Sequence, residues 1–223
     1  MEIFNLPINT KVNRVVPKNT FDTYTNTKQK KLFVDKVSRI TWTHKLSNKT
    51  TNLKTIEVSE IQVFKIELKV FEEIPQILEI IDRAIPSPII FSIQFEDQVY
   101  FATSSKHPHP TNPDNTIIDW LFKSKWGLIT KTSYSLNLKI SLDHVHKDFI
   151  LQLTGKTEDS SRSIQEIVEC HQKKHGLEKE IEQLKLQIKR SRQYKKKVEL
   201  NLQLKDKEKA LKQFKHESKK TPH

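Results

Sequence analysis

Apolar and polar residues alternate along residues 60–70 as they do in a β-strand with one buried face. Phe64, Ile66 and Leu68 share one face, and the positions between them carry charged side chains. Successive side chains of a strand point to opposite faces, so this pattern places one face of the segment in a core. Residues 60–70 are therefore predicted to form a strand.

Other segments have the 3.6-residue apolar spacing of helices that bury one side. Helices are predicted for residues 28–46, 76–85 and 144–154. Asp143 is the candidate N-cap of the last helix, and Gly155 is its C-terminal stop.

β-rich runs fill most of the sequence between these helices. The polar pair Glu96 and Asp97 joins two such runs, which predicts an antiparallel hairpin. Three prolines within residues 106–116 predict a loop. Further strands are predicted at residues 88–95, 98–105, 120–126 and 134–142. The predicted fold class is α+β, with a mixed, mostly antiparallel sheet and flanking helices in residues 1–155.

A long C-terminal helix of the coiled-coil type is predicted for residues 177–217. Neither Gly nor Pro occurs between Leu177 and Thr221, so the helix can run unbroken for about 40 residues. Residues 156–176 are predicted as a connecting helix, and residues 218–223 as a disordered tail. Four apolar residues have the 4-3-4 spacing of a seam that pairs with another helix: Leu177, Ile181, Leu184 and Ile188.

The apolar stripe changes phase after this seam. It resumes at Leu200, Leu204, Leu211 and Phe214. A stripe that drifts around the helix favours a short or irregular pairing over a uniform dimeric zipper. A short or irregular pairing can still join two copies of the chain, so a homo-oligomer is one of the partner hypotheses.

Positive charge is concentrated in the C-terminal part. The chain has 39 Lys and Arg against 27 Asp and Glu, and residues 156–223 hold 19 of these cations against 11 of the acids. The densest run has no acid within it and comprises Lys185, Lys189, Arg190, Arg192, Lys195, Lys196 and Lys197. Such a run favours either a phosphate-binding surface or a solvated helix that faces a partner. Tyr194 is the only aromatic residue in the run, so contact with duplex DNA would be mainly electrostatic.

The amino-acid composition argues against several classes of protein. Only 3 glycines are present, which argues against a Rossmann fingerprint or a phosphate-cradling loop. A single cysteine, Cys170, cannot form an intramolecular disulfide. The N-terminal residues lack the apolar stretch of a signal peptide, and no segment reaches the length of a membrane span. These features favour a cytoplasmic protein with no membrane partner.

Glu67 and Lys69 form the most specific candidate for catalytic chemistry. Residues two apart on a strand project from the same face, which matches the acid and lysine of Mg²⁺-dependent nucleases of the PD-(D/E)xK class. Glu60 or Asp35 would have to supply a second acid. The alternative is a solvated or salt-bridged strand face, which the abundance of Lys and Glu favours.

No metal or other cofactor is expected outside this nuclease hypothesis. His171 and His175 lie four residues apart on a predicted helix, and Cys170 adjoins them. Two side chains and an adjacent cysteine do not complete a tetrahedral zinc site.

Four segments, in this order along the chain, are KKLFVDKVSRITWTHKLS, EIQVFKIELK, IIDRAIPSPIIFSI and RQYKKKVELNLQL. Together they resemble the bacterial family called domain of unknown function 4391. The resemblance implies an accessory role, since genes of that family tend to lie beside DNA methyltransferases and helicases of restriction or phage-defence islands. It implies no catalytic residues, and residues 106–126 match the family poorly.

The leading hypothesis is a non-enzymatic subunit of a bacterial DNA-modification, restriction or defence assembly. Its α+β domain would bind a helicase or methyltransferase subunit, while the basic helix would bind duplex DNA or an acidic partner. The alternatives are a Mg²⁺-dependent nuclease and a structural homodimer that pairs through the C-terminal helix.

Overall fold

The computed structural model describes residues 3–155 and 161–217. The predicted disordered tail, 218–223, lies outside the described residues. The chain divides into two compact units, Met1–Ser161 and Arg162–His223. We call them the sheet unit and the helical hairpin, and describe each by itself.

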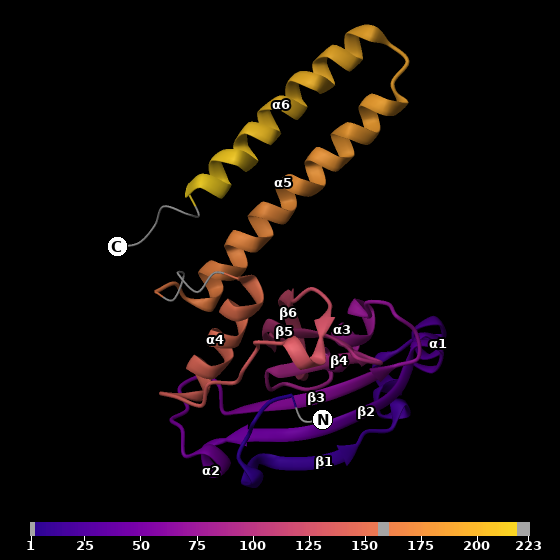
Figure 1. Cartoon of the computed structure of the whole chain (residues 1–223). Coiled ribbons are helices and arrows are strands. Elements are labelled where there is room, and N and C mark those ends of the chain that lie inside the picture. The colour runs from indigo at the N-terminus through magenta and orange to yellow at the C-terminus, as the bar shows by residue number, and fades with distance from the viewer. Residues whose placement is uncertain (1–2, 156–160, 218–223) are drawn as a thin grey trace. The chain divides into compact units, whose positions relative to one another are not determined.

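A mixed sheet of seven strands forms the centre of the sheet unit (Figure 1). Its order is β1-β2-β3-β4-β5-β6, and β7 pairs with β5. Only β3 and β4 are parallel, and the other neighbours are antiparallel. The strands are β1 (Lys11–Val15), β2 (Val37–Ser47), β3 (Glu60–Leu68), β4 (Ile89–Phe95), β5 (Gln98–His109), β6 (Asn112–Lys123) and β7 (Gly127–Leu128). The predicted α+β class with a mostly antiparallel sheet is confirmed.

In the described part of the sheet unit, four α-helices and three short 3-10 helices accompany the sheet. The α-helices are α1 (Thr27–Lys36), α2 (Asn48–Thr51), α3 (Pro75–Arg83) and α4 (Leu142–Thr154). The 3-10 helices are η1 (Ile8–Thr10), η2 (Lys18–Tyr24) and η3 (Ile129–Lys131). Helix α3 is the crossover that allows β3 and β4 to be parallel.

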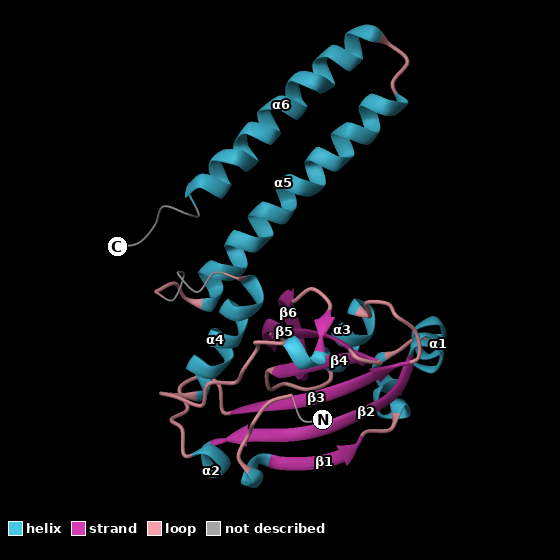
Figure 2. Ribbon diagram, in the orientation of Figure 1, coloured by secondary structure: helices cyan, strands magenta, loops and turns pink. Residues whose placement is uncertain are grey.

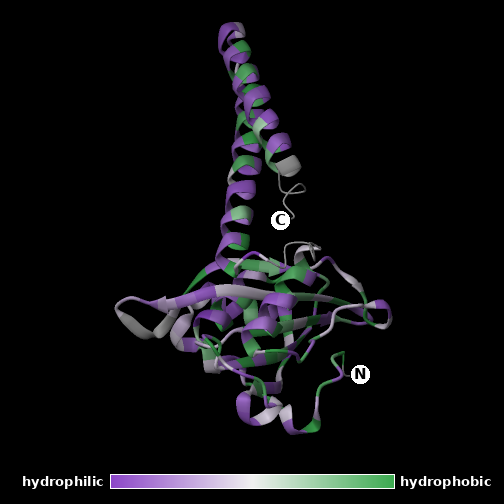
Figure 3. Ribbon diagram, turned by 90° about the vertical axis from the view of Figure 1, so that its left-hand side faces the viewer, coloured by the Kyte–Doolittle hydropathy of each residue, from purple (hydrophilic) through white to green (hydrophobic). Residues whose placement is uncertain are grey.

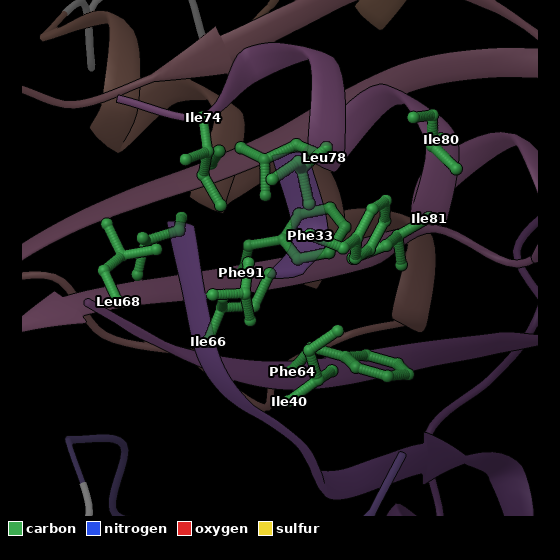
Figure 4. Packing of buried hydrophobic residues seen from close by; sticks show 14 of the residues in the cluster. Phe33, Ile40, Phe64, Ile66, Leu68, Ile74, Leu78, Ile80, Ile81 and Phe91 are labelled. Atoms are coloured by element: carbon green, nitrogen blue, oxygen red, sulfur yellow. The ribbon is translucent and has the colours of Figure 1, made fainter. Parts of the chain in front are cut away.

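The core lies on both faces of the sheet. On one face, Phe33 of α1 and Ile81 of α3 belong to a buried cluster with Phe91 of β4 (Figure 4). On the other face, Phe149 of α4 belongs to a second cluster with Ile90 of β4. Adjacent residues of one central strand thus serve opposite clusters, as the two-residue period of a strand requires. The sheet is the middle layer between helices.

The two ends of α4 agree only in part with the ends predicted from the sequence. Gly155 adopts the left-handed conformation, with φ 67°, and ends α4 as predicted. The N-cap of α4 is Ser141, whose side chain accepts a hydrogen bond from the His144 amide. The expected cap, Asp143, instead accepts hydrogen bonds from three backbone amides of the loop before β3, at 2.9–3.0 Å. These bonds hold the pKa of Asp143 below its usual range, although burial opposes them.

The helix predicted for residues 28–46 is wrong in its second half. Helix α1 ends at Lys36, and β2 begins at Val37. Ile40 and Trp42 then lie two residues apart on the face that packs against α1 and α3. Because β-branched and aromatic residues are frequent after Lys36, strand pairing with β3 prevails over helical spacing.

The loop predicted for residues 106–116 is also wrong. Strand β5 continues to His109, and β6 begins at Asn112. The β5–β6 register shifts between Ser105 and Lys106 and again after Pro108. Irregular positions of this kind accommodate proline, which cannot donate a ladder hydrogen bond.

The strand predicted for residues 134–142 does not form. Leu136 and Leu138 pack against the cluster that contains Phe149, but this segment joins no strand ladder. Its one β-bridge pairs Ser141 with Lys54. Alternating apolar residues here line the core from an extended segment.

Two antiparallel helices make up the helical hairpin (Figure 2). Helix α5 covers Ile164–Arg190 and helix α6 covers Tyr194–Glu217. Lys173 lies over the ring of Phe214, whereas Lys185, further along α5, reaches Glu208, further back along α6. Residues further along α5 thus contact residues earlier in α6, so the two helices run antiparallel.

The predicted continuous helix is therefore divided. Residues 191–193 interrupt it, and Ser191 has extended backbone angles, φ −70° and ψ 129°. Helix α5 in turn runs through the predicted boundary between residues 156–176 and 177–217 without a break. None of the described helices combines the length and the apolar character needed to cross a membrane.

Candidate functional site

All seven cations of the basic run lie around the turn of the helical hairpin. Three are near the end of α5, one is in the turn, and three are in the first turn of α6. All seven side chains are exposed. We call this group the basic turn: Lys185, Lys189, Arg190, Arg192, Lys195, Lys196 and Lys197.

The basic turn is poorly neutralised by the protein itself. Lys185 pairs with Glu208 at 3.4 Å. No ion pair involves the other six cations within the described part of the hairpin. The seven cations lie within thirteen consecutive residues at one end of the unit, so their charges add over a short distance. An exposed surface of this kind attracts a polyanion.

The two helix ends in the basic turn have opposite dipoles. Lys189 and Arg190 lie in the last turn of α5, where cations are favourable. Lys195, Lys196 and Lys197 lie in the first turn of α6, where the dipole is positive and no acid is present. These three lysines are therefore unfavourable for their own helix, and a bound anion would relieve that cost.

The four predicted seam residues face α6 rather than another chain. Ile181 of α5 and Leu200 of α6 are both buried, each with 7% of its surface exposed. Leu177, Leu184 and Ile188 are half-buried on the same side of α5 as Ile181. Figure 3 shows hydrophobic bands among the hydrophilic residues of both helices. In the structure, this side of α5 packs against α6 of the same chain.

The ion pair between Lys207 of α6 and Glu180 of α5 also joins the two helices, at 2.6 Å. It is about half exposed, so it adds little stability. The buried seam is consequently the main contact that holds the hairpin together.

Glu60 lies far from Glu67 and Lys69. Glu60 begins β3 and Glu67 is near its end, so about 23 Å of strand separates them. Glu67 pairs with Lys65 at 3.0 Å, and Lys69 Nζ donates a hydrogen bond to the backbone carbonyl of Val34 at 2.7 Å. The other candidate acid, Asp35, is exposed near the end of α1.

Glu60 has partners of its own at the far end of β3. Its carboxylate pairs with Lys45 at 2.6 Å and accepts a hydrogen bond from Gln62 at 3.1 Å. Among the described residues, no group of three or more His, Cys, Asp or Glu side chains is placed to hold a metal ion. The geometry therefore gives no specific support to Mg²⁺ chemistry at Glu67 and Lys69.

A buried ion pair that the sequence analysis missed lies between α3 and β5. Asp82 and Lys106 are 0% and 2% exposed, and Lys106 Nζ is 2.7 Å from Asp82 Oδ1. The same ammonium donates to the backbone carbonyls of Asp82 and Ile85, at 2.8 and 2.6 Å. Ser104 donates a hydrogen bond to the second carboxylate oxygen. Lys106 therefore satisfies carbonyls at the C-terminal end of α3 as well as the carboxylate.

Burial acts on both members of this pair. It raises the pKa of Asp82 and lowers the pKa of Lys106, while their mutual attraction opposes both shifts. Because both side chains are inaccessible, the pair has a structural role. No sequence signal indicated it, since Lys106 fell in a proline-rich segment read as a loop.

His146 of α4 is a second buried titratable group. Its Nε2 lies 3.1 Å from Thr103 Oγ1, whose own proton is donated to the Ile89 carbonyl at 2.7 Å. Nε2 is therefore the donor to Thr103. Burial, and secondarily the charge of Lys106, lowers the pKa of His146 to about 4. His146 is thus neutral at physiological pH.

Comparison with protein families assigns the chain. The model of the family described as "Domain of unknown function (DUF4391)" matches residues 4–211. The chain belongs to this family. The match covers nearly all of the sheet unit and most of the helical hairpin of this DUF4391 protein. No curated protein and no solved structure gives a match.

Proposed function

We propose that this DUF4391 protein is a non-enzymatic accessory subunit of a bacterial, cytoplasmic DNA-modification, restriction or anti-phage defence assembly. The basic turn binds the phosphate backbone of duplex DNA, and the sheet unit binds a helicase or methyltransferase subunit. The observation that carries the DNA-binding part is the gathering of seven exposed cations at one hairpin turn.

The mode of binding follows from the side chains at the turn. Tyr194 is the single aromatic residue there and is 84% exposed. One aromatic ring offers no platform on which successive bases could stack. Lysine and arginine at a convex helical turn instead contact phosphates, which contributes affinity without sequence preference.

Charge reversal in the basic turn tests this function. The triple variant Lys195→Glu, Lys196→Glu and Lys197→Glu should bind duplex DNA roughly 100-fold more weakly at about 50 mM salt. Fluorescence anisotropy with a labelled duplex measures the loss. Glutamates in the first turn of a helix are favoured by the dipole, so circular dichroism should show that α6 is retained.

A matched control lies on the same helix. Lys205, Lys209 and Lys212 are exposed lysines of α6 away from the turn. Reversing these three makes the same change in net charge and should weaken binding by less than about tenfold. Equal losses for the two triple variants would mean that net charge alone drives binding, and would reject the basic turn as the contact surface.

A further inference from the structure

A polar groove crosses the middle of the sheet unit. It lies on the sheet face whose other end is covered by α4. It spans β1 to β4 and has a volume of about 360 Å³. Val63 and Phe4 line it and also belong to the cluster that contains Phe149. Beyond them the same sheet face becomes polar, although the strands that carry it are central ones.

The strand register places polar side chains in two rows across this face. Thr41, Lys65 and Ser92 are direct neighbours on β2, β3 and β4. Arg39, Glu67 and Gln94 form the next row. Directly opposed residues on neighbouring strands project from the same face, so each row presents its side chains together.

Positive charge dominates the lining. Arg39, Lys65 and Lys11 line the groove, and among the described residues no acid does. Arg39 has no ion pair or hydrogen bond to any side chain among the described residues. Lys65 is held by Glu67, which follows it on the same face of β3 and whose carboxylate is 3.0 Å from the ammonium.

Polar groups deepen the groove between these cations. The hydroxyl-bearing residues Thr41 and Ser92 are each 5% exposed, so the floor is shielded from bulk water. Arg39 is exposed and Lys65 is half-buried, so both side chains are accessible to an anion in the groove. Arginine presents parallel N–H donors that match the oxygens of a phosphate.

We propose that this groove is a phosphate-binding site, in which Arg39 and Lys65 contact a phosphate monoester or diester. Glu67 holds Lys65 while the site is empty and competes with the incoming anion for its ammonium. The volume suits a phosphate with part of an attached nucleoside. The site lies in the sheet unit and does not depend on DNA binding by the basic turn.

Phosphorus-31 NMR tests the proposal on the full chain that carries the three reversals of the basic turn, so that the hairpin does not contribute. The probes are inorganic phosphate, a 5′-phosphorylated tetrathymidylate and the same oligonucleotide without the terminal phosphate. Terminal monoester and internal diester resonances are resolved, so the resonance that shifts saturably identifies the phosphate that binds. A shift of either kind supports the site.

Variants of the groove separate it from general charge effects. Arg39→Gln with Lys65→Gln should weaken binding at least about tenfold, whereas Glu67→Gln should tighten it about threefold because the competing carboxylate is removed. The control Lys31→Gln with Lys49→Gln removes two exposed lysines that do not line the groove. It should leave the affinity unchanged.

The result that overturns the proposal is equally specific. No saturable shift with any of the probes, or equal affinity for the wild-type groove and the Arg39 and Lys65 double variant, would show that the groove is not a phosphate site. Retained thermal unfolding of each variant shows that the fold is intact. A failure here would leave the duplex contact at the basic turn untouched, because that contact is measured with other variants.

Discussion

Replacing Lys106 by methionine is expected to lower the free energy of unfolding of the sheet unit by about 3–5 kcal/mol. The substitution keeps the volume of the side chain but leaves the Asp82 carboxylate buried without its cation, and it removes donors from two backbone carbonyls. Urea unfolding followed by tryptophan fluorescence reports on this unit, because Trp42, Trp120 and Trp126 all lie within it.

An adjacent surface pair provides the control. Arg83 and Glu79 form an i,i+4 ion pair on α3 that is about half exposed, so Arg83→Ala should cost less than about 0.5 kcal/mol. The double variant Asp82→Asn with Lys106→Met should recover part of the loss, since it removes the unpaired charge. A cost below about 1 kcal/mol for Lys106→Met alone would contradict the structural role of the pair.

Acidification should destabilise the sheet unit through His146. The pKa of this histidine is lowered from 6.5 to about 4 in the folded state, so the unfolded chain takes up a proton that the folded protein excludes. The stabilisation is complete above about pH 7 and is lost as the pH falls through 6.5 towards 4. The loss over this range is about 3 kcal/mol, from 1.36 kcal/mol per unit of pKa.

Comparison with His146→Gln isolates this contribution. Glutamine can still donate to Thr103 but does not titrate, so the variant should show a pH dependence that is weaker by about 3 kcal/mol. Asp82 acts in the opposite direction, because its raised pKa lets the folded state bind a proton first on acidification. Asp82 is present in both proteins and so drops out of the comparison. Parallel stability curves for the two proteins between pH 7 and pH 4 would contradict the account.

The elements that could be predicted from sequence are those in which one signal dominates. In β3, strict alternation and pairing on both sides agree, and the strand forms where expected. In β2, apolar residues satisfy both a helical and a strand period, and only the partner strand decides between them. The loop prediction for residues 106–116 is wrong for a related reason. The register shifts between β5 and β6 accommodate proline, which the local sequence associates with loops.

The hairpin turn illustrates a signal that was present but was read differently. The apolar stripe changes phase between Ile188 and Leu200, which is what two separate helices require of their facing sides. A continuous helix would also stack the cations of the basic turn at i,i+3 and i,i+4 spacing, where like charges repel. The break at residues 191–193 removes several of these neighbours and lets α6 cover the seam.

The two candidate binding surfaces also differ in whether the sequence alone reveals them. The basic turn is apparent from residue types alone, because seven cations in thirteen consecutive positions remain close in any helical arrangement. The groove is not, since Arg39, Lys65 and Ser92 come from three strands and only the register brings them together. Residues on separate strands cannot be associated without knowing the order of the sheet.

The salt dependence of duplex binding tests the central claim most directly, because its slope counts the phosphates that the protein contacts. The logarithm of the affinity should fall with the logarithm of the salt concentration with a slope of about −4 to −6 for the wild-type protein. Reversal of Lys195, Lys196 and Lys197 should reduce that slope by about 3, while reversal of Lys205, Lys209 and Lys212 should change it by less than about 1. A slope that is unchanged by the first set would show that the basic turn does not contact DNA.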